Sequence, residues 1–184
     1  MFLLMIVIAL TSRGRQKPKK RSHIESKPPR REPAPFNSQT AKPVPEVMSG
    51  AAYVVDGDTI RINKTQIRLF GVDAPEIDHP YGKKAKWALV SLCKGQTIRA
   101  EVTEKDAHGR TVARCYLPDG KDLSAEMVQM GLAIDWPKFS GGKYLSLETP
   151  DARKKLWLAD ARQKGRMHVW EKFEARQKLR KSND

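Results

Sequence analysis

The chain of 184 residues has little cysteine and little histidine, and this scarcity excludes two kinds of small protein. Its two cysteines, Cys93 and Cys115, are too few for a disulfide-stapled scaffold, and their spacing does not fit a zinc site. A single disulfide and two free thiols in a core both remain open. The four histidines show no metal-ligand spacing either.

Long hydrophobic runs are also missing. The run over residues 1–10 is apolar but short, because a membrane-spanning helix needs about 20 such residues. It resembles the apolar part of a signal peptide or a shortened anchor, so we expect residues 1–12 to be one of these. Six basic residues follow between positions 13 and 21, and such charges would hold the next segment in the cytoplasm if the run inserted. We expect an exported (periplasmic or extracellular) or membrane-tethered protein, with the cytoplasm left open.

Charge bias is absent from the middle of the chain, although the whole chain carries +14. Residues 1–47 hold ten basic and three acidic side chains, and residues 153–184 hold eleven and four. The flanks therefore carry the excess, which suits a polyanion such as nucleic acid or an anionic membrane surface, but also solvated tails. Proline and basic residues crowd positions 13–47, which we expect to be a disordered linker, and residues 171–184 form a basic tail.

The central part, residues 48–170, has the pattern of one small α+β domain that is mainly β. Alternation and turn residues predict five short strands, over residues 53–55, 59–62, 66–72, 97–103 and 111–117. Helical spacing predicts three helices: one between His79 and Gly95, one from Leu123 to Gly131, and one beginning at Thr149-Pro150. Strands in this order favour a five-stranded OB-type barrel with helices packed on it.

Three clusters carry candidate chemistry: Asp56-Gly-Asp58-Thr, then Arg68-Leu-Phe-Gly-Val-Asp73-Ala-Pro-Glu76, then Asp106-Ala-His-Gly-Arg110. Each alone is a weak signal, because Asp-Gly-Asp and Gly-Arg are common in turns. The alternative is a salt-bridged rim of the barrel.

Taken together, the clusters form a set that suits phosphoryl transfer. Asp58 and Asp73 end neighbouring strands, and two carboxylates held close favour a cation such as Ca²⁺ or Mg²⁺ between them. Glu76 could act as a base on a water molecule. Arg68 and Arg110 offer planar guanidinium groups for phosphate oxygens.

These motifs, in this order, resemble the thermonuclease family typified by staphylococcal nuclease, over about residues 53–170. The resemblance implies that Asp58, Asp73 and the backbone carbonyl of Ala74 bind Ca²⁺, with Asp56 nearby in the metal pocket. It also implies that Glu76 is the general base, and that Arg68 and Arg110 bind phosphate and stabilise the transition state.

The resemblance is weaker on the substrate side. His108 and Phe139 stand where the family has tyrosines near the nucleotide, and Lys83 and Lys84 could touch phosphate or simply be a solvated helix face. Trp136, like Phe139, could stack on a base or anchor a loop. Trp87 is expected to pack against other helices or the core.

We therefore expect a monomeric, calcium-dependent nuclease that hydrolyses phosphodiester bonds of DNA, RNA or both with low sequence specificity. Membrane association through the N-terminal segment is a further expectation. The alternative is a non-catalytic OB-type module that binds nucleic acid or a protein, and it predicts binding without a metal requirement and without a cleaved product.

Overall fold

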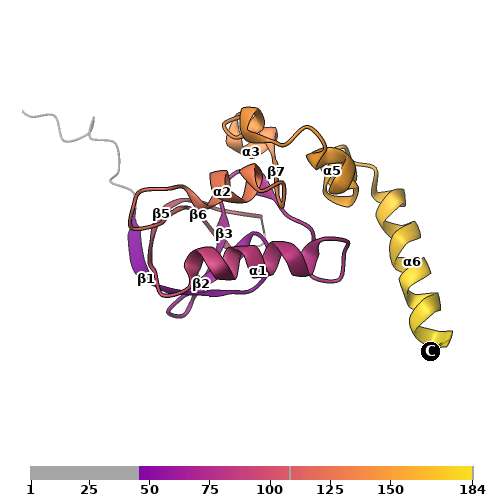
Figure 1. Cartoon of the computed structure of the whole chain (residues 1–184), viewed down its shortest axis with the longest axis horizontal. Helices are drawn as coiled ribbons and strands as arrows, with labels where there is room; N and C mark the ends of the chain where they lie inside the picture. The colour runs from indigo at the N-terminus through magenta and orange to yellow at the C-terminus, as the bar shows by residue number, and fades with distance from the viewer. Residues whose placement is uncertain (1–45, 108, 184) are drawn as a thin grey trace, which may run out of the picture. The chain divides into compact units, whose positions relative to one another are not determined.

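Five strands close into a barrel in the order β1-β2-β3-β6-β5, which confirms the expected mainly-β OB-type fold (Figure 1). The computed structural model describes residues 46–107 and 109–183. The expected anchor, nearly all of the expected linker, and His108 lie outside the described residues. All barrel neighbours are antiparallel except β3 and β6, and that parallel pair closes the barrel. The barrel strands are β1 (Val47–Val54), β2 (Thr59–Ile62), β3 (Thr65–Leu69), β5 (Thr97–Lys105) and β6 (Thr111–Tyr116).

The barrel interior is filled by the inward side chains of these strands. Ile60 and Ile62 of β2, Ile67 and Leu69 of β3, and Ile98 of β5 are all fully buried. The period of two in β2 and β3 places these apolar residues on one face, as the alternation predicted.

Helix α1 (Gly82–Cys93) packs against the barrel and α2 (Leu123–Gln129). Its buried residues Ala85, Leu89 and Cys93 follow one another at a spacing of four, which forms a single apolar face. Cys93 and Cys115 are both free and buried, so the structure has two core thiols and not a disulfide.

Two elements differ from the sequence-based expectation in ways that shape the site. The predicted strand over residues 66–72 is interrupted, because Gly71 turns the chain at a φ of 71°. Past this turn, β4 (Val72–Asp73) leaves the barrel and pairs with β7 (Ile134–Asp135). The first strand is also longer than predicted, since its early half pairs with β5 although it lacks strong apolar alternation.

The predicted third helix is broken in two at Leu156, which has φ −97° and ψ 42°. The halves are α4 (Ala152–Lys155) and α5 (Trp157–Gln163), and α6 (Met167–Asn183) follows. The remaining short helices are α3 (Pro137–Ser140) and η2 (Leu145–Leu147). Among the described residues, no helix combines the length and the apolar character needed to cross a bilayer.

Candidate active site

Asp58 lies in a tight turn that the local sequence builds. The carboxylate of Asp56 accepts the backbone N–H of Asp58 at 3.1 Å. Gly57, between them, faces α1 so closely that a Cβ would lie 2.7 Å from the Cβ of Ala85 and 2.8 Å from that of Ala74. Glycine is therefore needed for close approach of the turn to its neighbours, and the turn delivers a buried Asp58 to the start of β2.

Arg68 meets Asp58 because of the β2–β3 register. Thr59 is paired with Arg68 across the hairpin, so the preceding residue lies within reach of the guanidinium. Arg68 Nη2 lies 2.9 Å from Asp58 Oδ2, and Nη1 donates to Oδ1 at 3.2 Å. This two-bond arrangement is the strong form of an arginine–carboxylate pair. The same carboxylate also accepts the N–H of Ala74 at 3.3 Å.

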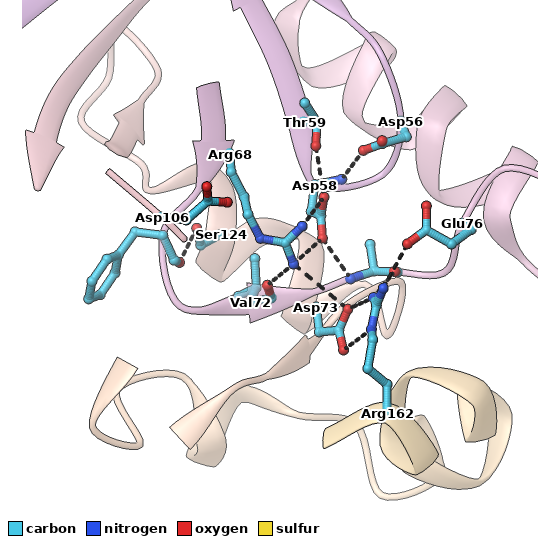
Figure 2. Close-up of polar contacts among 12 residues, drawn as sticks. Asp56, Asp58, Thr59, Arg68, Val72, Asp73, Glu76, Asp106, Ser124 and Arg162 are labelled. Atoms are coloured by element: carbon cyan, nitrogen blue, oxygen red, sulfur yellow. Dashed lines mark hydrogen bonds and ion pairs between the residues drawn. The ribbon is translucent and has the colours of Figure 1, made fainter. Parts of the chain in front are cut away.

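Asp73 is completely buried on β4, and its side chain points back toward Arg68 (Figure 2). Its Oδ1 lies 3.9 Å from Arg68 Nη2, the nitrogen that also contacts Asp58. The two carboxylates predicted to converge therefore approach one common atom. Burial raises the pKa of Asp73 to about 6, and the neighbouring Arg162 opposes that rise.

Arg162 is a central member of this site, although it was not among the site residues predicted from the sequence. Arg162 lies on α5, and its Nη2 donates to Asp73 Oδ1. Its Nε donates to Asp73 Oδ2 at 3.2 Å. Its Nη1 donates to Glu76 Oε1 at 2.7 Å. The only signal in the sequence was its place three residues after Ala159, on the predicted inner face of the third helix. A basic residue that extends an apolar face is a candidate for a buried ion pair.

Asp56 also lies at this site, in the turn before β2. Burial and the adjacent charge of Asp58 raise its pKa to about 6. The cluster in Figure 2 thus has acidic residues from the turn before β2, from β4 and from the loop after it, and arginines from β3 and α5.

Arg110 is held in place by the turn between β5 and β6. Its backbone N–H donates to Asp106 Oδ1 at 2.9 Å, and its Nε donates to Oδ2 at 2.7 Å. Gly109, with a φ of 74°, allows this tight turn. Arg110 lines the same cavity as Arg68.

That cavity has a volume of about 470 Å³ and is lined by both charged and aromatic groups. Arg68, Arg110 and Arg162 provide positive charge, and Trp136 and Phe139 provide ring faces. Trp136 lies within 5.9 Å of the guanidinium carbons of both Arg68 and Arg162. Guanidinium groups with aromatic rings are the combination that binds a phosphate next to a base.

The other substrate-side residues are placed differently. Lys83 and Lys84 are exposed on α1 and line a separate hollow beside Ile77 and Tyr81. Their role in binding substrate remains a prediction. Trp87 is 64% exposed, so the expectation that it packs in the core or against another helix was wrong. It lies on the outer face of α1, opposite the buried stripe.

The oxygen atoms predicted to bind a metal suit a hard divalent cation. They are the carboxylates of Asp58 and Asp73, which approach the same arginine nitrogen, and the carbonyl of Ala74. Within residues 46–107 and 109–183, no three His, Cys, Asp or Glu side chains form a metal-ligand group. The predicted set uses only two such side chains, and carboxylate and carbonyl oxygens are the donors that Ca²⁺ prefers.

Residues 66–171 match the family described as staphylococcal nuclease homologues. The chain is 34% identical over 111 residues to a probable staphylococcal-like nuclease of Oryza sativa subsp. japonica, covering 59% of this chain and 33% of that protein. It is 32% identical over 111 residues to an uncharacterized endonuclease of Escherichia coli O157:H7, covering 56% and 72%.

A third relative has a different kind of name. The succinoglycan biosynthesis protein ExoI of Rhizobium meliloti (strain 1021) is 34% identical over 114 residues, covering 56% of this chain and 60% of that protein. The chain therefore spans only part of the length of the rice and Rhizobium proteins. The matched region contains Arg68, Asp73, Glu76, Arg110 and Arg162.

Proposed function

Because the chain belongs to the family of staphylococcal nuclease homologues, we propose that it is a nuclease that hydrolyses phosphodiester bonds of DNA, RNA or both. One observation carries this proposal. Arg68 joins two features of the molecule, since it pairs with Asp58 in the carboxylate cluster and also lines the cavity shared with Arg110. A phosphate bound in that cavity would lie between two guanidinium groups and next to acidic residues.

The roles of the arginines follow from their positions. Arg68 is oriented by Asp58, and Arg110 is oriented by Asp106, so each guanidinium is fixed before substrate arrives. Preorganised donors stabilise the charge that develops on phosphate oxygens during the reaction, at little reorganisation cost. We assign Arg68 and Arg110 to this stabilisation.

Glu76 is the candidate base. Its side chain is 44% exposed, so water can reach it, and Arg162 holds one of its oxygens. A carboxylate in this position can accept a proton from the attacking water. Asp58, Asp73 and the Ala74 carbonyl would hold a divalent cation, which we propose to be Ca²⁺. Such an ion, when bound, neutralises charge on the phosphate and activates water.

Low sequence specificity is also part of the proposal. The ring faces of Trp136 and Phe139 can stack on any base, and phosphate contacts carry no sequence information.

A non-catalytic nucleic-acid-binding module is the second candidate, and one observation favours it. Arg162 already forms hydrogen bonds with Asp73 and Glu76, so these carboxylates are paired without any metal. Such a module would bind nucleic acid in a salt-dependent way and release no product.

A cleavage assay separates the two candidates. The full chain is incubated with single-stranded DNA and with RNA, in Ca²⁺, in Mg²⁺, in Mn²⁺ and in EDTA, and products are resolved by length. We expect cleavage with Ca²⁺ that stops in EDTA. Glu76→Gln, which keeps an oxygen that can accept from Arg162, is expected to bind substrate but not cut it. Binding without cleavage under every metal would leave the module as the function.

A further inference from the structure

Arg162 contacts the same atoms that the proposed nuclease needs for a cation. Its guanidinium bonds both oxygens of Asp73, and its Nη2 donates to the Ala74 carbonyl at 3.3 Å. These are two of the three groups expected to bind the metal. A further hydrogen bond, from Nη1 of Arg162 to Glu76 at 2.7 Å, holds the candidate base (Figure 2).

The surroundings hold Arg162 firmly in this position. Its guanidinium carbon lies 5.0 Å from the ring centre of Trp170 and 5.9 Å from that of Trp136. The side chain is only 20% exposed, and Asp73 is fully buried. A buried carboxylate without a cation nearby is strongly destabilising, and Arg162 supplies the closer of the two guanidinium groups at Asp73, since Arg68 lies 3.9 Å away.

We infer that Arg162 is an internal counter-ion that competes with the divalent cation for Asp73 and the Ala74 carbonyl. Arg162 Nη2 lies against both Asp73 Oδ1 and the Ala74 carbonyl oxygen, where an ion bound to those two oxygens would sit, so the ion binds there only when Arg162 withdraws. Withdrawal also frees Glu76 from its ion pair. The inference rests on the proposed metal-dependent function, and it adds that the apparent metal affinity of this chain is set by the strength of the Arg162 contacts.

The first experiment measures Ca²⁺ binding to the full chain by calorimetry, for the wild type and for Arg162→Gln. We expect the Ca²⁺ affinity of Arg162→Gln to be at least about tenfold higher than that of the wild type, because the ion no longer displaces a competing charge. Thermal unfolding of the same proteins gives a second readout. Without Ca²⁺ the variant should be less stable than the wild type, and Ca²⁺ should raise its unfolding temperature more than that of the wild type.

Arg153→Gln is the matched control. Arg153 also bridges carboxylates, with Nη2 2.7 Å from Glu148 and Nη1 3.3 Å from Asp160, but it touches none of the proposed metal ligands. Its loss should lower stability equally with and without Ca²⁺ and leave Ca²⁺ affinity unchanged. A purely structural Arg162 would behave in the same way as this control.

The outcomes distinguish the inference from the proposed function. Equal or weaker Ca²⁺ binding by Arg162→Gln, in a protein whose wild type cleaves nucleic acid with Ca²⁺, overturns the competition and leaves the nuclease intact. No Ca²⁺ binding by either protein overturns it as well, and the cleavage assay then decides the function separately. If Arg162→Gln does not fold, Arg162→Lys replaces it, because lysine keeps the charge without the paired contacts. A gain in Ca²⁺ affinity of about threefold or more then supports the inference, and a smaller gain overturns it.

Discussion

Arg110 allows a test of the phosphate-binding role with little effect on the fold. Its side chain is 37% exposed, and its main partner is Asp106 within the same turn. Replacing Arg110 with alanine should lower turnover about 100-fold, the cost typical of removing one preorganised donor. Stability should change by no more than about 1 kcal/mol, because a partly exposed ion pair contributes little. Turnover is measured at saturating metal, and folding is checked by thermal unfolding.

Arg99→Ala is the matched control for that measurement. Arg99 is also partly exposed and paired with an acidic neighbour, Glu101, but it does not line the cavity. It should leave turnover unchanged. Equal turnover in the Arg110 and Arg99 variants would contradict the role of Arg110.

Some contacts of the site could be predicted from sequence because they are local. Asp58 and Arg68 belong to one hairpin, and the register of that hairpin alone brings them together. The Asp106–Arg110 pair lies within a single turn. Short loops and alternating strands fix such pairs without knowledge of the rest of the fold.

The position of Arg162 could not be predicted in this way. It is separated from Asp73 by 89 residues, and its helix reaches the site only through tertiary packing. Arg162 lies outside the three motifs that suggested phosphoryl transfer. Its importance depends on which carboxylates it faces, and one sequence does not provide that information.

At the scale of whole elements, the turn before β2 depends on close packing with α1 and the loop after β4. Gly57→Ala places a methyl group 2.7 Å from Ala85 and 2.8 Å from Ala74, closer than carbon atoms tolerate. We expect the free energy of unfolding to fall by about 1–3 kcal/mol, as for other overpacked sites. Turnover should fall as well, because the same shift moves Asp58 and the Ala74 carbonyl.

Gly50→Ala is the comparison for this substitution. Its added Cβ would lie 3.0 Å from the γ-methyl group of Ile62 and 3.8 Å from Asn63 Oδ1, so it would meet one tight contact where Gly57 meets two closer ones. Gly50→Ala should lower the free energy of unfolding less than Gly57→Ala does, and it should leave turnover unchanged. If Gly57→Ala were as mild as Gly50→Ala, the turn would not be held by this contact.

The elements that differ from the prediction share one cause. The predicted strand over residues 66–72 contains only Gly71 as a signal of a break, and the helix predicted to begin at Thr149-Pro150 has no glycine or proline near Leu156. Gly71 bends the chain so that β4 can pair with β7, and Leu156 adopts a non-helical conformation between α4 and α5. Both breaks serve long-range packing, which overrides local propensity.

At the scale of the whole molecule, α6 carries part of the basic excess at the C-terminal end, with five basic and two acidic side chains. The first part of this helix is attached to the domain, since Trp170 Nε1 donates to the Leu158 carbonyl at 2.7 Å and Phe173 packs against His79. Beyond Glu174 the described side chains are mostly exposed, including Leu179 at 65%. A helix that is polar on all sides does not add to a core.

Removing residues 175–184 should therefore leave the fold intact and weaken only electrostatic binding. The segment contains four basic side chains. If they contact phosphates, the slope of log affinity against log salt for single-stranded DNA should become shallower by up to about three. The free energy of unfolding should change by less than about 0.5 kcal/mol, as for other surface changes. Replacing Arg176, Lys178 and Arg180 with glutamine in the full chain separates charge from contact, and should reproduce most of the change. An unchanged slope in both proteins would show that the basic end of α6 is a solvated helix with no part in substrate binding.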